Sequence, residues 1–102
     1  MKMISYWKGI DGQPDPLEIY EDEEGLVFII GTYDHKNQNK AKKALGIHWG
    51  DFPKSRGILA PCVIPAETRS AILAGLLHQA INKKDMKAIN RISDAINFFI
   101  NQ

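Results

Sequence analysis

The stretch LVFIIGTY, residues 26–33, decides the fold that the sequence predicts. It is nearly continuous in apolar and β-branched residues, which is typical of a central strand covered on both faces. Just before it, residues 17–21 alternate between apolar and polar side chains, the pattern of a half-buried strand. The polar segment Asp22 to Gly25 supplies a turn between the two strands. Residues 17–33 therefore predict a β-hairpin.

Two further segments extend this sheet. Residues 3–10 are rich in β-forming side chains, and residues 11–16, DGQPDP, have the composition of a turn. Residues 58–64 can form another strand, but Pro61 has no amide hydrogen to donate, so that strand is expected at an edge or with a bulge. The sheet is thus expected to use residues 3–33 and 58–64.

The segment between these strands favours a helix. The run KAKKAL follows polar residues, and Asn37 or Asn39 could cap a short helix over residues 38–45. Gly46 would then be the left-handed residue that ends it. This short helix would cross over between the two parts of the sheet.

The C-terminal third predicts two amphipathic helices. Pro65 suits a first helical position, and Asp85 can cap the second helix. At 100° per residue, apolar side chains gather on one side of each helix. They are Ile72, Leu73, Leu76, Leu77, Ala80 and Ile81 in the first helix, and Ile89, Ile92, Ile96, Phe99 and Ile100 in the second.

Together these elements predict a single α+β domain over residues 1–102. It has a small, mostly antiparallel sheet of about four strands, the short crossover helix, and a C-terminal antiparallel helical hairpin packed on one face of the sheet. Two features depart from the helical pattern. Ala71, Ala74 and Gly75 form a small-residue strip on the polar side of the first helix, and Phe98 points away from the apolar stripe of the second. Either could be buried by packing or could mediate self-association into a homo-oligomer.

Composition bounds the class of protein. A chain of 102 residues with 44% hydrophobic and 25% charged residues is typical of a globular domain. Cys62 is the only cysteine, which excludes an internal disulfide and fits a reducing compartment. The N-terminus lacks the apolar run of a signal peptide, and no stretch approaches the length of a membrane span. We therefore expect a cytoplasmic protein, bacterial or phage-borne, with no membrane association.

The net charge of +1 conceals an asymmetry. Residues 1–35 contain eight acidic residues and two lysines, a net charge of −6, whereas residues 36–102 contain eleven basic and four acidic residues, a net charge of +7. Such a division can orient a charged partner, or it can simply keep two solvated faces soluble.

The stretch from Gly46 to Pro65, GIHWGDFPKSRGILAPCVIP, holds the candidate binding residues. Its first half has no helical period and no clean alternation, and it is dense in chemically capable side chains, as binding loops often are. The candidates are His48, Trp49, Asp51, Phe52, Lys54 and Arg56. An alternative is purely structural: the two aromatic residues would anchor the loop to the core, and Arg56 would pair with Asp51 or with the acidic segment.

Catalytic and metal-binding patterns are not found in the sequence. Cys62 lies in an apolar strand context that disfavours a thiolate, and Ser55 is not in a Gly-x-Ser-x-Gly motif. The histidines and cysteine have no metal-ligand spacing, so no metal or cofactor is expected. Phosphodiester cleavage would need His48 as acid or base, with His35 as a second group if folding brought the two together. Enzymatic activity is therefore uncertain, and the sequence favours its absence.

Two functions remain as hypotheses. The favoured one is a small protein-binding module that masks a partner, such as a toxin or nuclease, in the manner of an immunity protein, an antitoxin or a phage-encoded inhibitor. Trp, Phe and Arg are residue types that dominate interface energies, and the acidic Glu21 to Glu24 segment could cover a basic partner. The alternative is a nucleic-acid or anionic-ligand-binding protein that uses Lys54, Arg56 and the lysines of residues 36–43.

Overall fold

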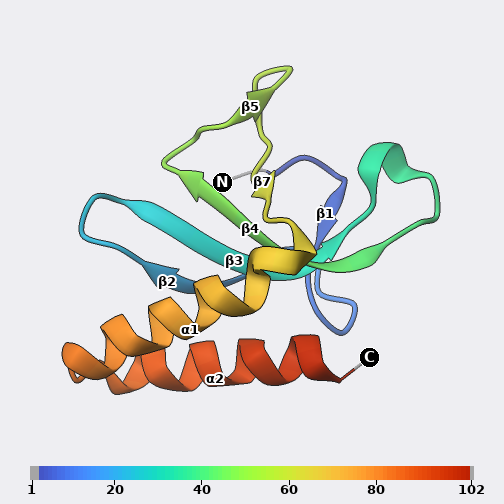
Figure 1. The fold of residues 1–102 in the computed structure, drawn as a ribbon. Helices are drawn as coiled ribbons and strands as arrows, with labels where there is room; N and C mark the ends of the chain where they lie inside the picture. Colours follow the sequence, from blue (N-terminus) through green and yellow to red (C-terminus); the bar gives the residue numbers. More distant parts are fainter. Residues whose placement is uncertain (1–2, 102) are drawn as a thin grey trace. The chain divides into compact units, whose positions relative to one another are not determined.

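The sheet is built around β3 (Leu26–Tyr33) in the computed structural model, which describes residues 3–101 (Figure 1). The chain divides into two compact units, Met1–Ile64 and Pro65–Gln102. The first unit contains every strand, and the second contains both α-helices. The α+β class predicted from the sequence is confirmed. The single domain over residues 1–102 stays a prediction.

The main sheet has five antiparallel strands. They are β1 (Trp7–Lys8), β2 (Leu17–Glu21), β3, β4 (Lys42–Trp49) and β7 (Cys62–Val63). The order is β1-β3-β4-β7, and β2 pairs with β3 as well, so β1 and β2 occupy successive parts of one edge of β3. The bounds of β2 and β3 are those predicted, and their turn ends at Gly25 with a φ of +87°.

The prediction of a short helix over residues 38–45 is wrong. Residues 42–45 are instead the first half of β4. All eight residues of β4 pair with β3, from Tyr33 opposite Lys42 to Leu26 opposite Trp49. Ala and Lys favour helices, but strand preference depends on pairing and burial, and these override local propensity here. Alternation of Leu45, Ile47 and Trp49 along one face is the sequence signal that could have revealed the strand.

Gly46 is therefore not a helix terminus. It lies within β4, opposite Ile29 on one side and Val63 on the other. A Cβ added there would lie 2.6 Å from Cη2 and Cζ2 of the Trp7 indole. Glycine at this position gives the indole room to pack against the strand.

The predicted strand over residues 58–64 is divided in two. β6 (Ile58–Leu59) pairs with β5 (Lys54–Ser55) in a separate two-stranded sheet, whereas β7 joins β4 at the edge of the main sheet. Pro61 lies between β6 and β7, and its carbonyl accepts a hydrogen bond of 3.1 Å from Nε1 of Trp7. The predicted edge position is confirmed for β7.

The first unit has a core centred on Trp7. This indole is 2% exposed and clusters with Val27, Ile29 and Ala44 on one face of the β3–β4 pair. Met3, Ile4 and Tyr33 pack against the cluster. β3 has buried residues on its other face too, including Ile30, as the continuous apolar run predicts.

The second unit is the predicted helical hairpin, α1 (Ala66–Asn82) and α2 (Met86–Ile100). Arg69 near the start of α1 stacks on Phe99 near the end of α2, with 4.1 Å from the guanidinium carbon to the ring centroid, so the helices are antiparallel. Asp85 caps α2 as predicted, because its Oδ1 accepts a hydrogen bond of 3.1 Å from the Ala88 amide. In the described chain, neither helix has the length and apolar character needed to cross a membrane.

The predicted helix faces are only partly right. The buried side chains are Leu73, Leu76 and Ala80 in α1, and Ala88, Ile92, Ala95 and Phe99 in α2. Ile81 and Ile100, assigned to the apolar stripes, are exposed. The strip of Ala71, Ala74 and Gly75 is exposed too. A Cβ at Gly75 would meet no atom within 4 Å, so a closely packed helix does not explain this glycine.

Candidate functional site

The six predicted binding residues all lie in the arm, residues 48–59, which begins at the end of β4. His48 and Trp49 complete β4, so they belong to a strand and not to a loop. Trp49 and Phe52 then exchange two backbone hydrogen bonds of 2.9 and 3.0 Å, closing a turn with Gly50 and Asp51 at its centre. Gly50 has a φ of +56°, which glycine adopts without steric cost. The turn fixes the two aromatic residues opposite each other.

The Trp49 and Phe52 side chains are half exposed, at 47% and 53% of their surface. Directly opposite residues of an antiparallel pair share one face, so the two rings lie on the same side of the strand ladder. The structural alternative predicted that both anchor the arm to the core. Each residue keeps about half of its surface exposed and has the rest covered by the protein, so the structural alternative stays a prediction. Aromatic side chains are enriched in contact surfaces.

Lys54 is held by its neighbours. Its Nζ forms a salt bridge of 2.9 Å with Oδ2 of Asp51 and lies 5.5 Å from the centroid of the Phe52 ring. The predicted pairing of Arg56 with Asp51 is therefore replaced by the pair between Asp51 and Lys54. Lys54 is thus partly neutralised by Asp51, and the anion site suggested for Lys54 and Arg56 stays a prediction.

The hydrogen bond and the charge of Lys54 lower the pKa of Asp51 below its ordinary value of 3.8. The pair therefore stabilises the fold at pH values above 3.8, and this contribution is lost as the pH falls through the folded-state pKa. We expect Lys54→Met to return the Asp51 titration midpoint toward 3.8, measured by NMR of the side-chain carboxyl carbon. Lys87→Met is the control, and an unchanged midpoint in Lys54→Met would contradict the pairing.

The tip of the arm is a tight turn at Arg56 and Gly57, between β5 and β6. Both residues have positive φ, 53° and 77°, as the central residues of a type I′ turn require. Asn and Gly adopt this conformation most easily, whereas Arg is strained there. A strained residue at an exposed tip is consistent with a role for its side chain.

His48 and His35 do not come together. Val27 is opposite His48, whereas His35 follows Tyr33, which is opposite Lys42 at the other end of the same strand pair. Six residues of strand at roughly 3.3 Å each separate these positions along β4. His48 Nδ1 instead contacts the Gly50 carbonyl oxygen at 3.1 Å. The structure therefore does not assemble the two-histidine pair considered for phosphodiester cleavage.

The acidic turn, Glu21 to Gly25, lies beside the aromatic pair, which the sequence alone does not reveal. The turn leads directly into Leu26, and Leu26 is the residue opposite Trp49. Figure 1 shows the β2–β3 turn and the end of β4 at the same end of the sheet. Glu21, Glu23 and Glu24 are exposed there.

The opposite end of the β3–β4 pair is basic and aromatic. The connecting segment includes the 3₁₀ helix η1 (His35–Asn37) and carries Lys36 and Lys40, with Lys42 opening β4. The Asp34 carboxylate accepts hydrogen bonds from three backbone amides, those of residues 38–40, and so fixes this segment.

Tyr33, Tyr6 and His35 form a ring cluster at this end. The Tyr33 hydroxyl lies 2.8 Å from Nδ1 of His35, and its ring is 6.2 Å from that of Tyr6. Burial, and secondly the neighbouring Tyr6, raise the pKa of Tyr33 above its ordinary value of 10.0. The three rings contact one another, and the Tyr33 hydroxyl is hydrogen-bonded within the cluster. These local contacts are sufficient to explain why the residues are there.

Cys62 is exposed in β7. The predicted strand is confirmed at this position, but the apolar sequence around the cysteine does not bury it, because β7 is a two-residue strand at the edge of the sheet. Over residues 3–101, no three His, Cys, Asp or Glu side chains are grouped so as to hold a metal ion.

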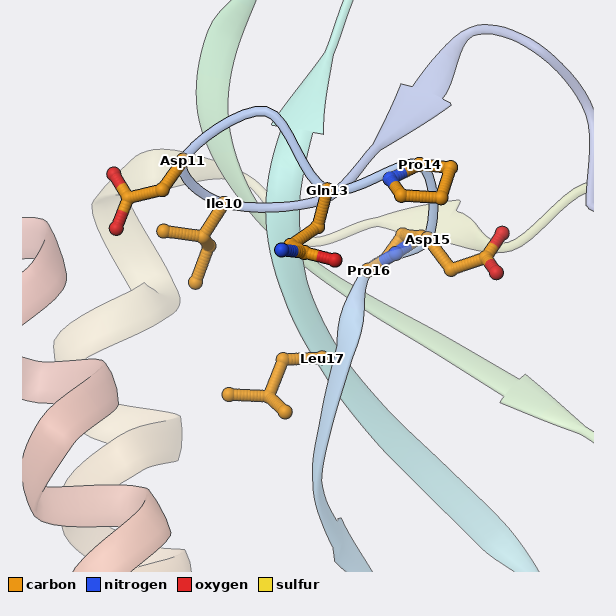
Figure 2. A pocket seen from close by; sticks show the side chains of 7 residues that line it. All are labelled: Ile10, Asp11, Gln13, Pro14, Asp15, Pro16 and Leu17. Atoms are coloured by element: carbon orange, nitrogen blue, oxygen red, sulfur yellow. The ribbon is translucent and has the colours of Figure 1, made fainter.

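A pocket of about 450 Å³ lies in the loop between β1 and β2 (Figure 2). Ile10, Asp11 and residues 13–17 line it, and the sequence predicted only a turn over residues 11–16. Figure 2 shows Ile10 and Leu17 as its apolar lining and the carboxylates of Asp11 and Asp15 pointing away from each other. The two carboxylates therefore cannot act together on one cation, and the pocket does not assemble a recognisable chemistry.

Comparison of the chain with protein-family models, with curated proteins and with solved structures finds no match.

Proposed function

We propose that this chain is a small cytoplasmic protein-binding module that masks a partner protein, in the manner of an immunity protein, an antitoxin or a phage-encoded inhibitor. The contact surface is the recognition arm, defined as residues 48–59. This segment comprises the end of β4, the turn from Trp49 to Phe52, and the β5–β6 hairpin. Figure 1 shows the arm extending beyond the end of β4.

The observation that carries the proposal is the half-exposed pair of Trp49 and Phe52. Large aromatic side chains contribute most when a partner buries them, because each offers a wide apolar surface with few rotatable bonds to order. The backbone bonds between the two residues fix the turn from which both side chains extend. Such preorganisation lowers the entropy cost of association.

The neighbouring groups support the same role. Lys54 Nζ lies over the Phe52 ring and pairs with Asp51, and Phe52 is still 53% exposed. Arg56 is placed at the exposed tip by its turn. Arginine and aromatic residues are enriched at the centres of interfaces. Masking, and not catalysis, is what this set of side chains is suited to do.

We expect the double substitution of Trp49→Ala and Phe52→Ala to weaken partner binding by at least about 30-fold, the size of a hot-spot effect. The purified chain and the variant would be immobilised in parallel and mixed with lysate of the organism that encodes them. Recovered proteins would be quantified by mass spectrometry, and the affinity of each would then be measured with purified material.

The matched control removes two equally exposed apolar side chains from the helices. Met86 and Ile100 are 63% and 67% exposed, so Met86→Ala with Ile100→Ala changes a similar apolar area away from the arm. A partner retained by the wild type and the control but lost by the arm variant supports the proposal. Equal recovery of every protein by all three chains would overturn it.

Nucleic-acid binding is the second candidate, and a different surface favours it. Lys36, Lys40 and Lys42 gather beside the ring cluster at the far end of the β3–β4 pair. Cations next to aromatic rings are the usual elements of a single-strand binding site. The lysines at that end, and not Lys54, would then carry the salt dependence of binding.

A further inference from the structure

The register of the β3–β4 pair places two turns at one end of the sheet. β3 begins at Leu26, immediately after the acidic turn, and β4 ends at Trp49, immediately before the aromatic one. Residues directly opposite in an antiparallel pair have Cα atoms about 4.5–5.5 Å apart. The acidic turn and the aromatic turn therefore lie at one end of the sheet, the acidic-aromatic end, defined as residues 21–25 and 49–52. Glu21 is opposite Val27, so its side chain lies on the other face of the sheet from Trp49, whereas Glu24 belongs to the turn that leads into Leu26, the residue opposite Trp49.

Both turns are ordered by their own hydrogen bonds. Oδ1 of Asp22 accepts bonds of 2.9 Å from the Glu24 amide and 2.8 Å from the Leu26 amide. Asp22 therefore acts within the turn, and Gly25 supplies the left-handed residue that closes it. Glu21 and Glu24 remain as exposed carboxylates on a fixed backbone.

We propose that the acidic-aromatic end binds a cationic protein surface, one in which Lys or Arg side chains surround an apolar patch. This inference rests on the proposed function and names the chemical class of its partner. Trp49 and Phe52 enter the apolar patch, while Glu24 of the acidic turn meets a cation at the edge of the patch and Glu21 adds negative charge to the same end of the sheet. Charge complementarity at the edge of an interface raises the association rate and excludes partners of the wrong charge.

The distribution of charge along the β3–β4 pair supports this class of partner. The carboxylates lie at the Leu26 end, and Lys36, Lys40 and Lys42 lie beyond the Tyr33 end. The acidic turn attracts a basic protein and disfavours a polyanion such as RNA near the aromatic pair, while Lys54 is paired with Asp51 and Arg56 lies farther away, in the turn between β5 and β6. The basic end of a second copy is also cationic, so self-association is a distinct outcome of the test.

The proposal can be tested with two synthetic peptides of 16 residues, one of alternating Arg and Leu and the other of alternating Glu and Leu. Binding to the full chain would be measured by fluorescence anisotropy, and the contacted amides would be mapped by NMR. We expect only the Arg peptide to bind, with shifts confined to residues 21–26 and 48–54. Its affinity should fall at least about tenfold between low salt and roughly 0.5 M salt, as exposed charge pairs are screened.

Two pairs of charge reversals provide matched variants. Glu21→Lys with Glu24→Lys changes the acidic turn, and Asp15→Lys with Asp94→Lys makes the same net change elsewhere on exposed positions. We expect the first pair to weaken Arg-peptide binding about tenfold and the second to leave it within about twofold. Trp49→Ala should also weaken it in the absence of any charge change. Circular dichroism would establish that each variant is folded.

The outcomes separate this inference from the proposed function. Loss of binding in both Trp49→Ala and the turn variant supports the inference. A host partner that depends on Trp49 but not on the acidic turn overturns the inference and leaves the proposed function standing. No dependence on Trp49 in either assay overturns both. Equal binding of the two peptides, RNA binding mapped to residues 49–52, or dimerisation through the acidic turn at low salt would each overturn the inference.

Discussion

Replacing Trp7 with alanine is expected to lower the free energy of unfolding by about 3–5 kcal/mol, the range for truncating a buried aromatic side chain. The indole is 2% exposed and packs in the cluster with Val27, Ile29 and Ala44. Its loss leaves a cavity and also leaves the Pro61 carbonyl without its donor, Nε1. For a domain of ordinary stability, about 5–15 kcal/mol, this is a large fraction of the total.

Equilibrium urea unfolding followed by far-ultraviolet circular dichroism would measure this effect, because that signal does not depend on the tryptophan removed. Trp7→Phe is the companion variant if Trp7→Ala does not fold, since it keeps an aromatic ring and removes the hydrogen bond. We expect it to be intermediate. Met86→Ala, an exposed side chain, serves as the control. A loss below about 1 kcal/mol in Trp7→Ala, as for ordinary surface positions, would contradict the central position of this indole.

The second large effect is expected at Gly46. A Cβ there lies 2.6 Å from two carbons of the Trp7 ring and 3.2 Å from the Cys62 carbonyl oxygen. The ring cannot move away easily, because it is buried and hydrogen-bonded to Pro61. Gly46→Ala is therefore expected to lower the free energy of unfolding by about 1–3 kcal/mol, the usual cost of overpacking.

Gly75 provides a control with the opposite sign. It lies inside α1, has no atom near its missing Cβ, and does not have positive φ. Gly75→Ala should raise the free energy of unfolding by roughly 0.5–1 kcal/mol, the helix preference of alanine over glycine.

A double-mutant cycle ties the cost at Gly46 to the indole. In a Trp7→Leu background the space in front of Gly46 is larger, so Gly46→Ala should cost much less than in the wild type. Contacting residues commonly show coupling of about 0.5–3 kcal/mol. The free energy of unfolding of the four chains would be measured by denaturant unfolding. If the effects of the two substitutions are additive, the indole is not what limits the size of residue 46.

The elements with a strong local pattern were predictable from the sequence. β2, β3 and the two helices follow from alternation, a continuous apolar run and the 3.6-residue period, and the Asp85 cap follows from its position before α2. β4 was not predictable, because Lys and Ala favour a helix and a glycine at position 46 is typical of the residue that ends one. The strand forms because β3 and β7 supply hydrogen-bond partners on its two edges.

The candidate site was predictable in its residue types but not in its contacts. Trp49, Phe52 and Arg56 were identifiable because such side chains gather between elements of clear pattern. The pairing of Lys54 with Asp51 was not predictable, because Lys54 and Arg56 are both close enough to Asp51 in the sequence to pair with it. The position of the acidic turn beside Trp49 depends on the register of β3 and β4, which pairing across the sheet sets and no local pattern encodes.

The two tryptophans occupy opposite environments, with Trp7 2% exposed and Trp49 47% exposed. Their emission therefore carries two separable signals. Emission from Trp7 is expected to be shielded from an aqueous quencher until the fold opens, whereas emission from Trp49 is expected to be quenched in the native state. If a partner binds over Trp49 as proposed, that emission should become protected from the quencher. Quenching of tryptophan fluorescence in a single unlabelled sample could thus follow unfolding through Trp7 and binding of the proposed partner through Trp49.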